Sequence, residues 1–234
     1  MDNGEGKFKV KIKMDKNLTI SVVIPAYNEE GNISRLLDAL QRQTRIPDEV
    51  IVVDDGSNDG TVEIVSTYSR GVTLIEGPHE GVNAARHKGT LKARSDIVVQ
   101  TDADCIPSRD WIEKIGSCFG TDRELIGLTG NVYDYKGRIF EGITAGVANR
   151  IFPGMGSITA YRRDAYLKTS GYNSAIPVHF GGDVEFWRRL NKEGKCVHDT
   201  SIVARHNSGY KWKAVGIAIV ISGAILVAGM VVGY

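Results

Sequence analysis

The chain has 234 residues, with 29 Lys or Arg against 28 Asp or Glu, so its formal net charge is +1 at pH 7. This length supports one large domain with a sizeable core, and a hydrophobic fraction of 42% is ordinary for a globular protein. The near-neutral balance lacks the basic excess of most nucleic-acid-binding proteins, so we expect no nucleic-acid partner. Cys105, Cys118 and Cys196 are scattered without paired metal-ligand spacing, which predicts reduced thiols rather than disulfides.

Residues 1–17 form a basic extension in which "KFKVKIKM" alternates lysines with apolar residues. A period of two predicts an amphipathic strand with one basic face. Such a face can rest on anionic lipid headgroups. It can equally protect an edge strand from pairing with other chains, and the sequence leaves both interpretations open.

The next hundred residues alternate between strand and helix patterns. β-rich runs occupy residues 18–28, 48–60, 71–77 and 96–104. Helical patterns occupy residues 29–43, 61–69 and 81–95. Strands that alternate with helices through short loops predict parallel βαβ units, so we expect a doubly wound α/β domain with helices on both faces of its sheet.

Polar and acidic residues follow three of these strands at the point where each one ends. The first strand is followed by Glu29, the second by Asp54 and Asp55, and the fourth by Asp102 and Asp104. In open α/β sheets the ligand lies outside the carboxyl ends of the strands, so these carboxylates should gather at one site. Crowded carboxylates repel one another unless a cation lies among them, and hard oxygen ligands suit Mg²⁺ or Mn²⁺.

Other interpretations of these acids carry weight as well. Acids after a strand are often turn or cap residues, and we expect Asp59 to be one of them. The chain has neither a GxxxxGK[ST] loop nor a GxGxxG motif after its first strand. P-loop enzymes and dinucleotide dehydrogenases are therefore not supported.

Residues 214–234, "AVGIAIVISGAILVAGMVVGY", contain no charge over 21 positions. About 20 apolar residues span a bilayer as a helix, so we expect a transmembrane helix over 211–234, with a buried core helix as the alternative. Arg205, Lys211 and Lys213 precede the segment and predict a single-pass protein of the cell membrane with its large domain on the cytoplasmic side. Small residues at 214, 218 and 222 could form a helix-packing face and so a homo-oligomer.

Several stretches of the chain resemble a known family when they are taken together. They are "SVVIPAYNEEGNISRLLDAL", "VIVVDDGSNDGT", "GVNAARHKG", "TDADCIPSRDWIEKI", "GSITAYRRDAYLKTSGY" and "GGDVEFWRRLNKEGK". In this order they are similar to the motifs of the family 2 inverting glycosyltransferases with the GT-A fold. The resemblance covers roughly residues 18 to 206 and implies a transferase domain over residues 18–210.

The resemblance implies a site for a nucleotide-sugar donor. The positions that match its base and ribose pocket are Pro25, Tyr27, Glu29, Asp55 and Arg86. Asp54 is the first acid of its pair and would orient the second. Asp102 is the first acid of the family's DxD motif, which faces the ribose or the sugar. The family leaning is towards a UDP-sugar.

The resemblance also implies a metal ion and a catalytic base. Asp104, the second acid of the DxD motif, matches the ligand of the divalent cation on the diphosphate. His206 resembles a histidine that completes this site in some members. Asp183 aligns with the base that takes the acceptor proton, although the residue before it is Gly182 where the usual family form has an acid. Asp183 also fits the N-cap of the helix that follows, and both roles can hold together.

The apolar C-terminal segment and the expected catalytic base together predict the class of acceptor. A membrane segment beside a cytoplasmic site predicts an acceptor presented at the bilayer, such as a lipid-linked saccharide or another glycolipid. A base favours a hydroxyl acceptor, because a phosphate is already ionised. The alternatives are a polyprenyl- or dolichyl-phosphate sugar synthase, a catalytically silent membrane-tethered nucleotide-sugar-binding module, and a nucleotidyltransferase, whose basic Gly-rich N-terminal signature the chain lacks.

Overall fold

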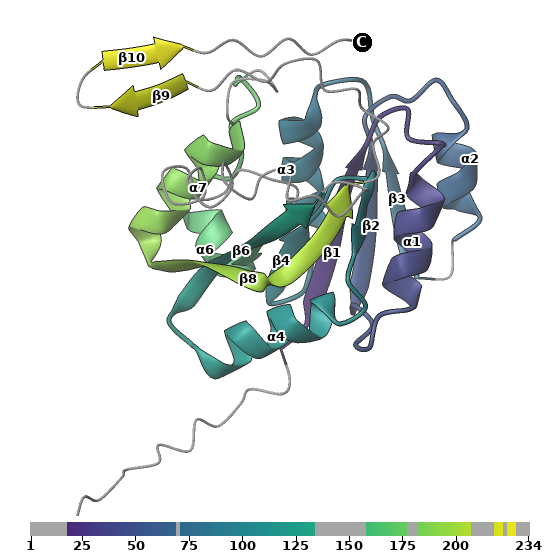
Figure 1. The fold of residues 1–234 in the computed structure, drawn as a ribbon. Coiled ribbons are helices and arrows are strands. Elements are labelled where there is room, and N and C mark those ends of the chain that lie inside the picture. The colour runs from purple at the N-terminus through teal and green to yellow at the C-terminus, as the bar shows by residue number, and fades with distance from the viewer. Residues whose placement is uncertain are drawn as a thin grey trace, which may run out of the picture.

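The computed structural model describes residues 18–68, 71–133, 158–176 and 182–206, and the backbone of residues 218–221 and 224–227. The first half of its large sheet is the parallel arrangement that the sequence predicts (Figure 1). Its strands are β3 (Val72–Glu76), β2 (Glu49–Asp54), β1 (Ile20–Ala26) and β4 (Ile97–Gln100), in that order across the sheet. All neighbours among these four strands pair in parallel.

The second half of the sheet is mixed, and it extends the first half beyond β4. Its strands follow in the order β7 (Thr159–Arg162), β6 (Leu125–Tyr133), β8 (Lys195–His206) and β5 (Cys105–Pro107). β7 is antiparallel to both of its neighbours, β6 and β8 pair in parallel, and β5 is antiparallel to β8. The expected strand over 96–104 therefore ends at Gln100, and Asp102 and Asp104 lie in the connection between β4 and β5.

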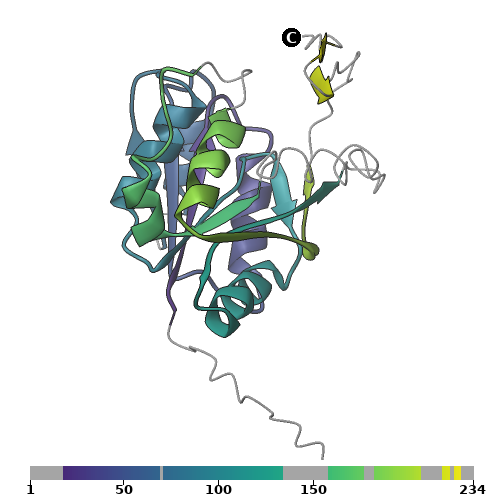
Figure 2. The same cartoon turned by 90° about the vertical axis from the view of Figure 1, so that its left-hand side faces the viewer.

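Helices cover both faces of the sheet, as Figure 2 shows from the side. One face carries α1 (Ile33–Gln41), α2 (Thr61–Ser66) and α4 (Trp111–Thr121). The other face carries α3 (Val82–Lys92), α6 (Arg163–Lys168) and α7 (Gly182–Glu193). The expectation of a doubly wound α/β domain is confirmed for this part of the chain.

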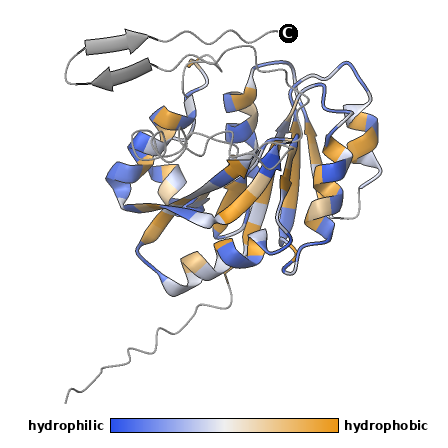
Figure 3. Ribbon diagram, viewed as in Figure 1, coloured by the Kyte–Doolittle hydropathy of each residue, from blue (hydrophilic) through white to orange (hydrophobic). Residues whose placement is uncertain are grey.

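The strands supply one hydrophobic core on each face because their side chains alternate between the two sides. Val22 and Ile24 of β1 lie in the core under α1, whereas Val23 lies in the core under α3. β1, β2 and β4 contribute buried apolar residues to both cores, and Figure 3 shows the middle of the sheet mostly in orange. Trp187 of α7 is 2% exposed and packs in the second core.

The C-terminal segment differs from the helix expected over residues 211–234. The structure describes Ala218–Ile221 as strand β9 and Ala224–Val227 as strand β10, paired antiparallel as a two-stranded sheet. Ile and Val are frequent here, and β-branched residues fit a strand as readily as an apolar helix. Among the described residues, no helix combines the length and the apolarity needed to cross a bilayer. The remaining residues of 211–234, and the basic extension 1–17, lie outside the described residues.

Candidate active site

β1 and β4 stop pairing before their carboxyl ends. Their pairing ends at Val23 and Gln100, and one further hydrogen bond joins the Thr101 N–H to the Val23 carbonyl at 3.3 Å. Pro25 lies buried just beyond this point, where β1 no longer needs an N–H for β4. β1 leads to β2 on one side while β4 lies on the other, so this is a topological switch point, the usual ligand site of such sheets.

The Asp54 carboxylate closes the turn that follows β2. Its Oδ2 accepts hydrogen bonds from the N–H groups of Gly56 and Ser57, each at 3.1 Å, and its Oδ1 accepts one from the Ser57 hydroxyl at 2.5 Å. Gly56 has φ of +83°, a left-handed conformation that glycine adopts without strain. Asp54 thus shapes the turn that presents Asp55.

Asp55 holds the loop that follows β3. Its two carboxylate oxygens accept hydrogen bonds from the N–H groups of Glu80 and Gly81, at 2.9 and 2.8 Å. The Nδ1 atom of His79 lies 2.9 Å from the same carboxylate, and the His79 ring stacks on Tyr27 with 4.2 Å between ring centroids. Tyr27 is 42% exposed, so an aromatic side chain reaches the surface close to Asp55. An aromatic face of this kind can stack a nucleobase.

Arg86 of α3 bridges the two acids Asp102 and Asp183. Its Nη2 donates to Asp102 Oδ1 at 2.7 Å, and its Nη1 donates to Asp183 Oδ1. The guanidinium is only 9% exposed, and it lies 5.8 Å from the ring centroid of Tyr172. Burial raises the pKa of Asp183, Arg86 opposes this rise, and Asp102 adds to it. The bridge therefore holds Asp183 as a partly desolvated carboxylate in the first turn of α7, suited to accept a proton.

The pairing of β5 with β8 brings His206 to Asp104. In this antiparallel pair Cys105 lies opposite His206, and the His206 Nε2 atom is 3.0 Å from Asp104 Oδ2. The Asp104 carboxylate is 11% exposed. Burial, and next the charge of Asp102, raise the pKa of Asp104 to about 7. A carboxylate in this setting gains strongly from a cation.

The side chains at this point fit a divalent cation. Asp104, Cys105 and His206 place one possible ligand atom each within 4.8 Å of one another. Adjacent ligands of an octahedral ion, each at about 2.1 Å, lie about 3 Å apart, which is the separation of Asp104 Oδ2 and His206 Nε2. Carboxylate and imidazole are ligands that suit manganese, whereas the thiol of Cys105 suits softer metals.

Glu29 faces the same acids from the end of β1. Burial, and then the charges of Asp104 and Asp102, raise the pKa of Glu29 to about 7, while a hydrogen bond from Asn32 to its Oε2 at 3.0 Å lowers it. The sequence assigned Glu29 to the base and ribose pocket. The structure adds that it belongs to the acidic group around Asp102 and Asp104, so three carboxylates and His206 lie close together at this edge of the sheet.

Comparison with protein families identifies residues 21–144 as a match to "Glycosyl transferase family 2". The match covers more than half of the chain and contains both acid-bearing turns. The chain belongs to glycosyl transferase family 2. Among its curated relatives is glycosyltransferase AglE of Haloferax volcanii, which is 40% identical over 120 residues, or 48% of this chain and 39% of AglE.

Solved structures of glycosyltransferases share the fold. Staphylococcus aureus TarS in complex with UDP-GlcNAc matches with a TM-score of 0.69 at 19% identity, over 86% of this chain and 62% of that one. The mannosyltransferase PcManGT of Pyrobaculum calidifontis, in complex with GDP-Man and Mn²⁺, matches with a TM-score of 0.65 at 20% identity, over 84% and 61%. These likenesses confirm the GT-A type of fold. The chain spans between 13% and 52% of the length of the first curated relatives that it matches.

One departure from the usual form of family 2 lies at a close contact between α7 and α3. Gly182 stands directly before Asp183, where an acid is usual. A Cβ atom at Gly182 would collide with the side-chain amide of Asn83, which itself donates to the Ile176 carbonyl at 3.1 Å. α7 therefore begins against the Asn83 side chain of α3, and the next residue, Asp183, contacts Arg86 of the same helix.

Three residues of this family 2 site carry no expected role from the sequence. The sequence pattern predicts no role for His79 or Tyr172, and for Cys105 it predicts only a reduced thiol. His79 was within reach of sequence reasoning, because it follows β3 at the same sheet edge as Asp55. Tyr172 and Cys105 were not, because their positions depend on contacts between segments far apart in the chain. Asp59, expected as a turn or cap residue, is confirmed as one by its hydrogen bonds to Glu30 and Thr61.

Proposed function

We propose that the chain is a metal-dependent inverting glycosyltransferase that moves a sugar from a nucleotide-sugar to a hydroxyl group of a membrane-presented acceptor. The observation that carries this proposal is the bridge from Asp183 through Arg86 to Asp102, two residues from Asp104. It connects a carboxylate that is suited to take a proton with carboxylates that are suited to hold a cation, and this cation would bind the diphosphate.

The donor end is assigned to the side chains at the carboxyl ends of β1, β2 and β4. Tyr27 and His79 would stack the base, and Asp55 has lone pairs left to accept from it. Pro25 and Glu29 line the pocket at the end of β1, and Asp54 fixes the turn that carries Asp55. Asp102 would accept from the ribose or the sugar.

The reaction is a single displacement at the anomeric carbon. The acceptor oxygen forms a bond to this carbon, the bond to the diphosphate oxygen breaks with its electron pair, and the acceptor proton passes to Asp183. A divalent cation, when bound by Asp104 and His206, would stabilise the charge that develops on the leaving diphosphate. Arg86 keeps Asp183 oriented and compensates its charge until the proton arrives.

The acceptor side of the proposal rests on the apolar C-terminal sequence. Residues 214–234 carry no charge, and Lys211 and Lys213 precede them. We propose that this segment holds the domain at the cell membrane, on the cytoplasmic side, where a lipid-linked or glycolipid acceptor is presented. A UDP-sugar is the favoured donor, and one structural neighbour, TarS, was solved with UDP-GlcNAc.

A thermal-shift panel of UDP-, GDP- and dTDP-sugars with and without Mn²⁺ tests the donor site. We expect one nucleotide class to raise the melting temperature in a Mn²⁺-dependent manner. The rise should disappear in Asp104→Asn and persist in Asp164→Asn, which removes an exposed acid on α6. No shift with any donor, or an equal shift in both variants, would overturn the proposal.

A further inference from the structure

A groove with a volume of about 430 Å³ lies between α1 and the edge strand β5, away from the Arg86 bridge. Its polar lining residues include Arg35, Asp38, Arg42 and Arg109, and its apolar ones include Ile106 and Pro107. The volume falls within the usual range of small-molecule sites, and it exceeds what a lone phosphate ion would fill. The groove thus combines guanidinium groups with an apolar wall.

The charges in this groove are not balanced within the described part of the chain. Asp38 is already engaged, because it lies 3.3 Å from Arg42 and accepts a hydrogen bond from the Tyr68 hydroxyl at 2.8 Å. Arg35 and Arg109 are exposed, and no described acid forms an ion pair with either of them. The groove therefore presents an excess of positive charge to solvent.

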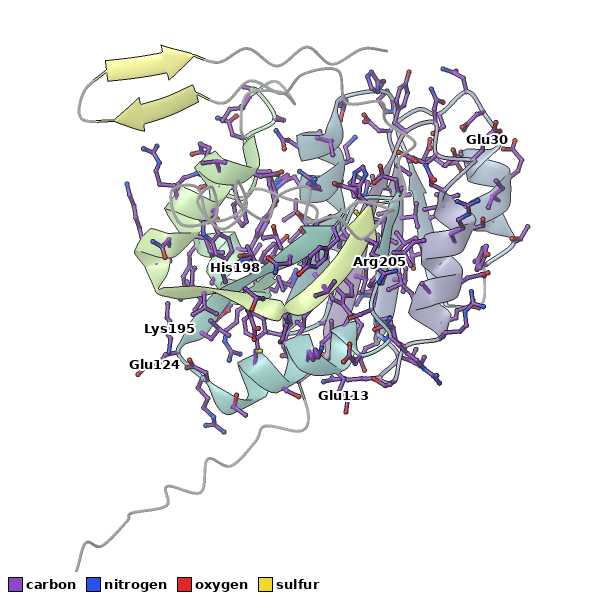
Figure 4. All side chains as sticks on the ribbon, in the orientation of Figure 1. Glu30, Glu113, Glu124, Lys195, His198 and Arg205 are labelled. Atoms are coloured by element: carbon purple, nitrogen blue, oxygen red, sulfur yellow. The ribbon has the colours of Figure 1, made fainter. Side chains whose placement is uncertain are left out.

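Arg205 adds a further guanidinium at the same edge. It stands directly opposite Ile106 in the pairing of β5 with β8, and residues opposite one another in an antiparallel pair share a face of the sheet. Figure 4 shows Arg205 at the end of β8, on the side towards α1. It is exposed and has no acidic partner among the described residues. Three arginines therefore line the groove, and Arg205 is a fourth beside its apolar wall.

We propose that this groove binds the phosphate headgroup of an anionic membrane lipid. Guanidinium groups bind phosphate oxygens in pairs, and three of these four have no competing acid among the described residues. The wall formed by Ile106 and Pro107 would contact the glycerol and the first carbons of the lipid chains. After Arg205 and His206 the sequence continues to Lys211, Lys213 and the 21 uncharged residues of 214–234, so the groove lies beside the strand that leads towards the apolar segment.

The proposed lipid site and the donor site consist of different residues, and each is tested by its own experiment. A nucleotide-sugar is not needed to fill it, and donor binding does not require it. A free phosphate would contact the arginines but leave the apolar wall uncovered. A lipid phosphate covers both parts of the groove, which is why a lipid is the occupant that the lining favours.

Hydrogen exchange of the full chain with dihexanoyl phosphatidylglycerol, kept below its micelle concentration, tests the site. A monomeric lipid is chosen because the apolar C-terminal segment could bind vesicles by itself. We expect slower exchange in α1 and in residues 105–109, and much weaker effects from dihexanoyl phosphatidylcholine or inorganic phosphate. Equal protection by phosphatidylcholine, or by inorganic phosphate, would overturn an anionic lipid as the occupant.

A triple variant and a matched control locate the effect. Arg35→Gln with Arg109→Gln and Arg205→Gln should weaken binding of the anionic lipid by about tenfold or more, since each basic residue near a headgroup contributes about fivefold. Arg94→Gln with Arg188→Gln and Lys192→Gln removes the same charge from exposed positions elsewhere and should change binding less than about twofold. Equal losses in the two variants would overturn the proposal. The donor-induced thermal shift, measured in both, reports separately on the transferase site.

Discussion

A pair of acids lies at the carboxyl end of β2 and another follows β4, yet the two pairs are stabilised in different ways. Asp54 and Asp55 accept hydrogen bonds chiefly from backbone N–H groups of their own turn and of the loop after β3. Asp102 and Asp104 instead face ionisable side chains, Arg86 and His206. The first turn is completed by the fold itself, whereas the second is completed by ionisable partners.

The difference shows which turn carries the ligand-dependent chemistry. Backbone N–H groups keep the same charge at every pH and hold Asp55 in one place. Within the described part of the chain no backbone N–H of another residue donates to Asp104, and the carboxylate lies near Asp102 and Glu29, whose charges oppose its ionisation. Such a carboxylate lowers the stability of the protein until a cation arrives, and that is a common property of functional sites.

Asp104→Asn should give the largest effects: turnover should fall, whereas the stability of the metal-free protein should rise. Loss of the carboxylate would remove the metal, and turnover should fall by about 10³-fold or more, because a metal supplies several kcal/mol to the transition state. The variant without metal should be more stable at pH 8 by on the order of 2 kcal/mol, since Asn avoids ionising a buried acid.

The sign follows from the raised pKa of Asp104, which is about 7 in the folded chain. Between the usual pKa of an aspartate and pH 7 the folded state binds more protons than the unfolded state. The free energy of unfolding therefore falls as pH rises through this window. Urea unfolding of both proteins at pH 8, without metal, measures the difference. A loss of stability in Asp104→Asn would make the acid structural, like Asp54.

The parallel half of the fold could be predicted because its signals are local. Each βα unit carries its own apolar run and its own polar end, and parallel strands bring those ends to one edge. The pattern therefore placed Asp54, Asp55, Asp102 and Asp104 correctly at strand ends before any long-range contact was known. A polar residue at the end of a strand can thus be assigned to the site from the sequence. The atoms that its side chain contacts cannot be predicted in this way.

The mixed half depends on contacts that no local pattern contains. His206 reaches Asp104 through the register of β8 with β5, and Asp183 reaches Arg86 because α7 begins beside the side chains of α3. These contacts join segments roughly a hundred residues apart, so periodicity could suggest the elements but not their partners. In the C-terminal segment, uniform apolarity is compatible with a helix or with strands, and it was interpreted as a helix where the structure has β9 and β10.

The two turns should also differ in how they respond to pH. Mn²⁺ must displace the proton of Asp104, so its affinity should fall by about tenfold for each pH unit below 7 and level off above it. Glu29, Asp102, Cys105 and His206 face the same point, and protons on them would only steepen the fall. Calorimetric titration with Mn²⁺ at several pH values between 5.5 and 8.5 measures this slope. An affinity independent of pH would place the metal away from Asp104.

Asp54→Ala should give the smallest effect on ligand binding, because the role of Asp54 is to close a turn. The substitution removes three accepted hydrogen bonds, and at about 1 kcal/mol or less for each it should lower the free energy of unfolding by about 2 kcal/mol. Asp54→Asn keeps one carbonyl acceptor and should lose less. Donor affinity, measured well below the melting temperature, should change by less than about tenfold, since Asp55 keeps its bonds to Glu80 and Gly81. If donor binding instead disappears while stability is unchanged, Asp54 contacts the donor itself, and the contrast between a structural turn and a ligand-dependent turn fails.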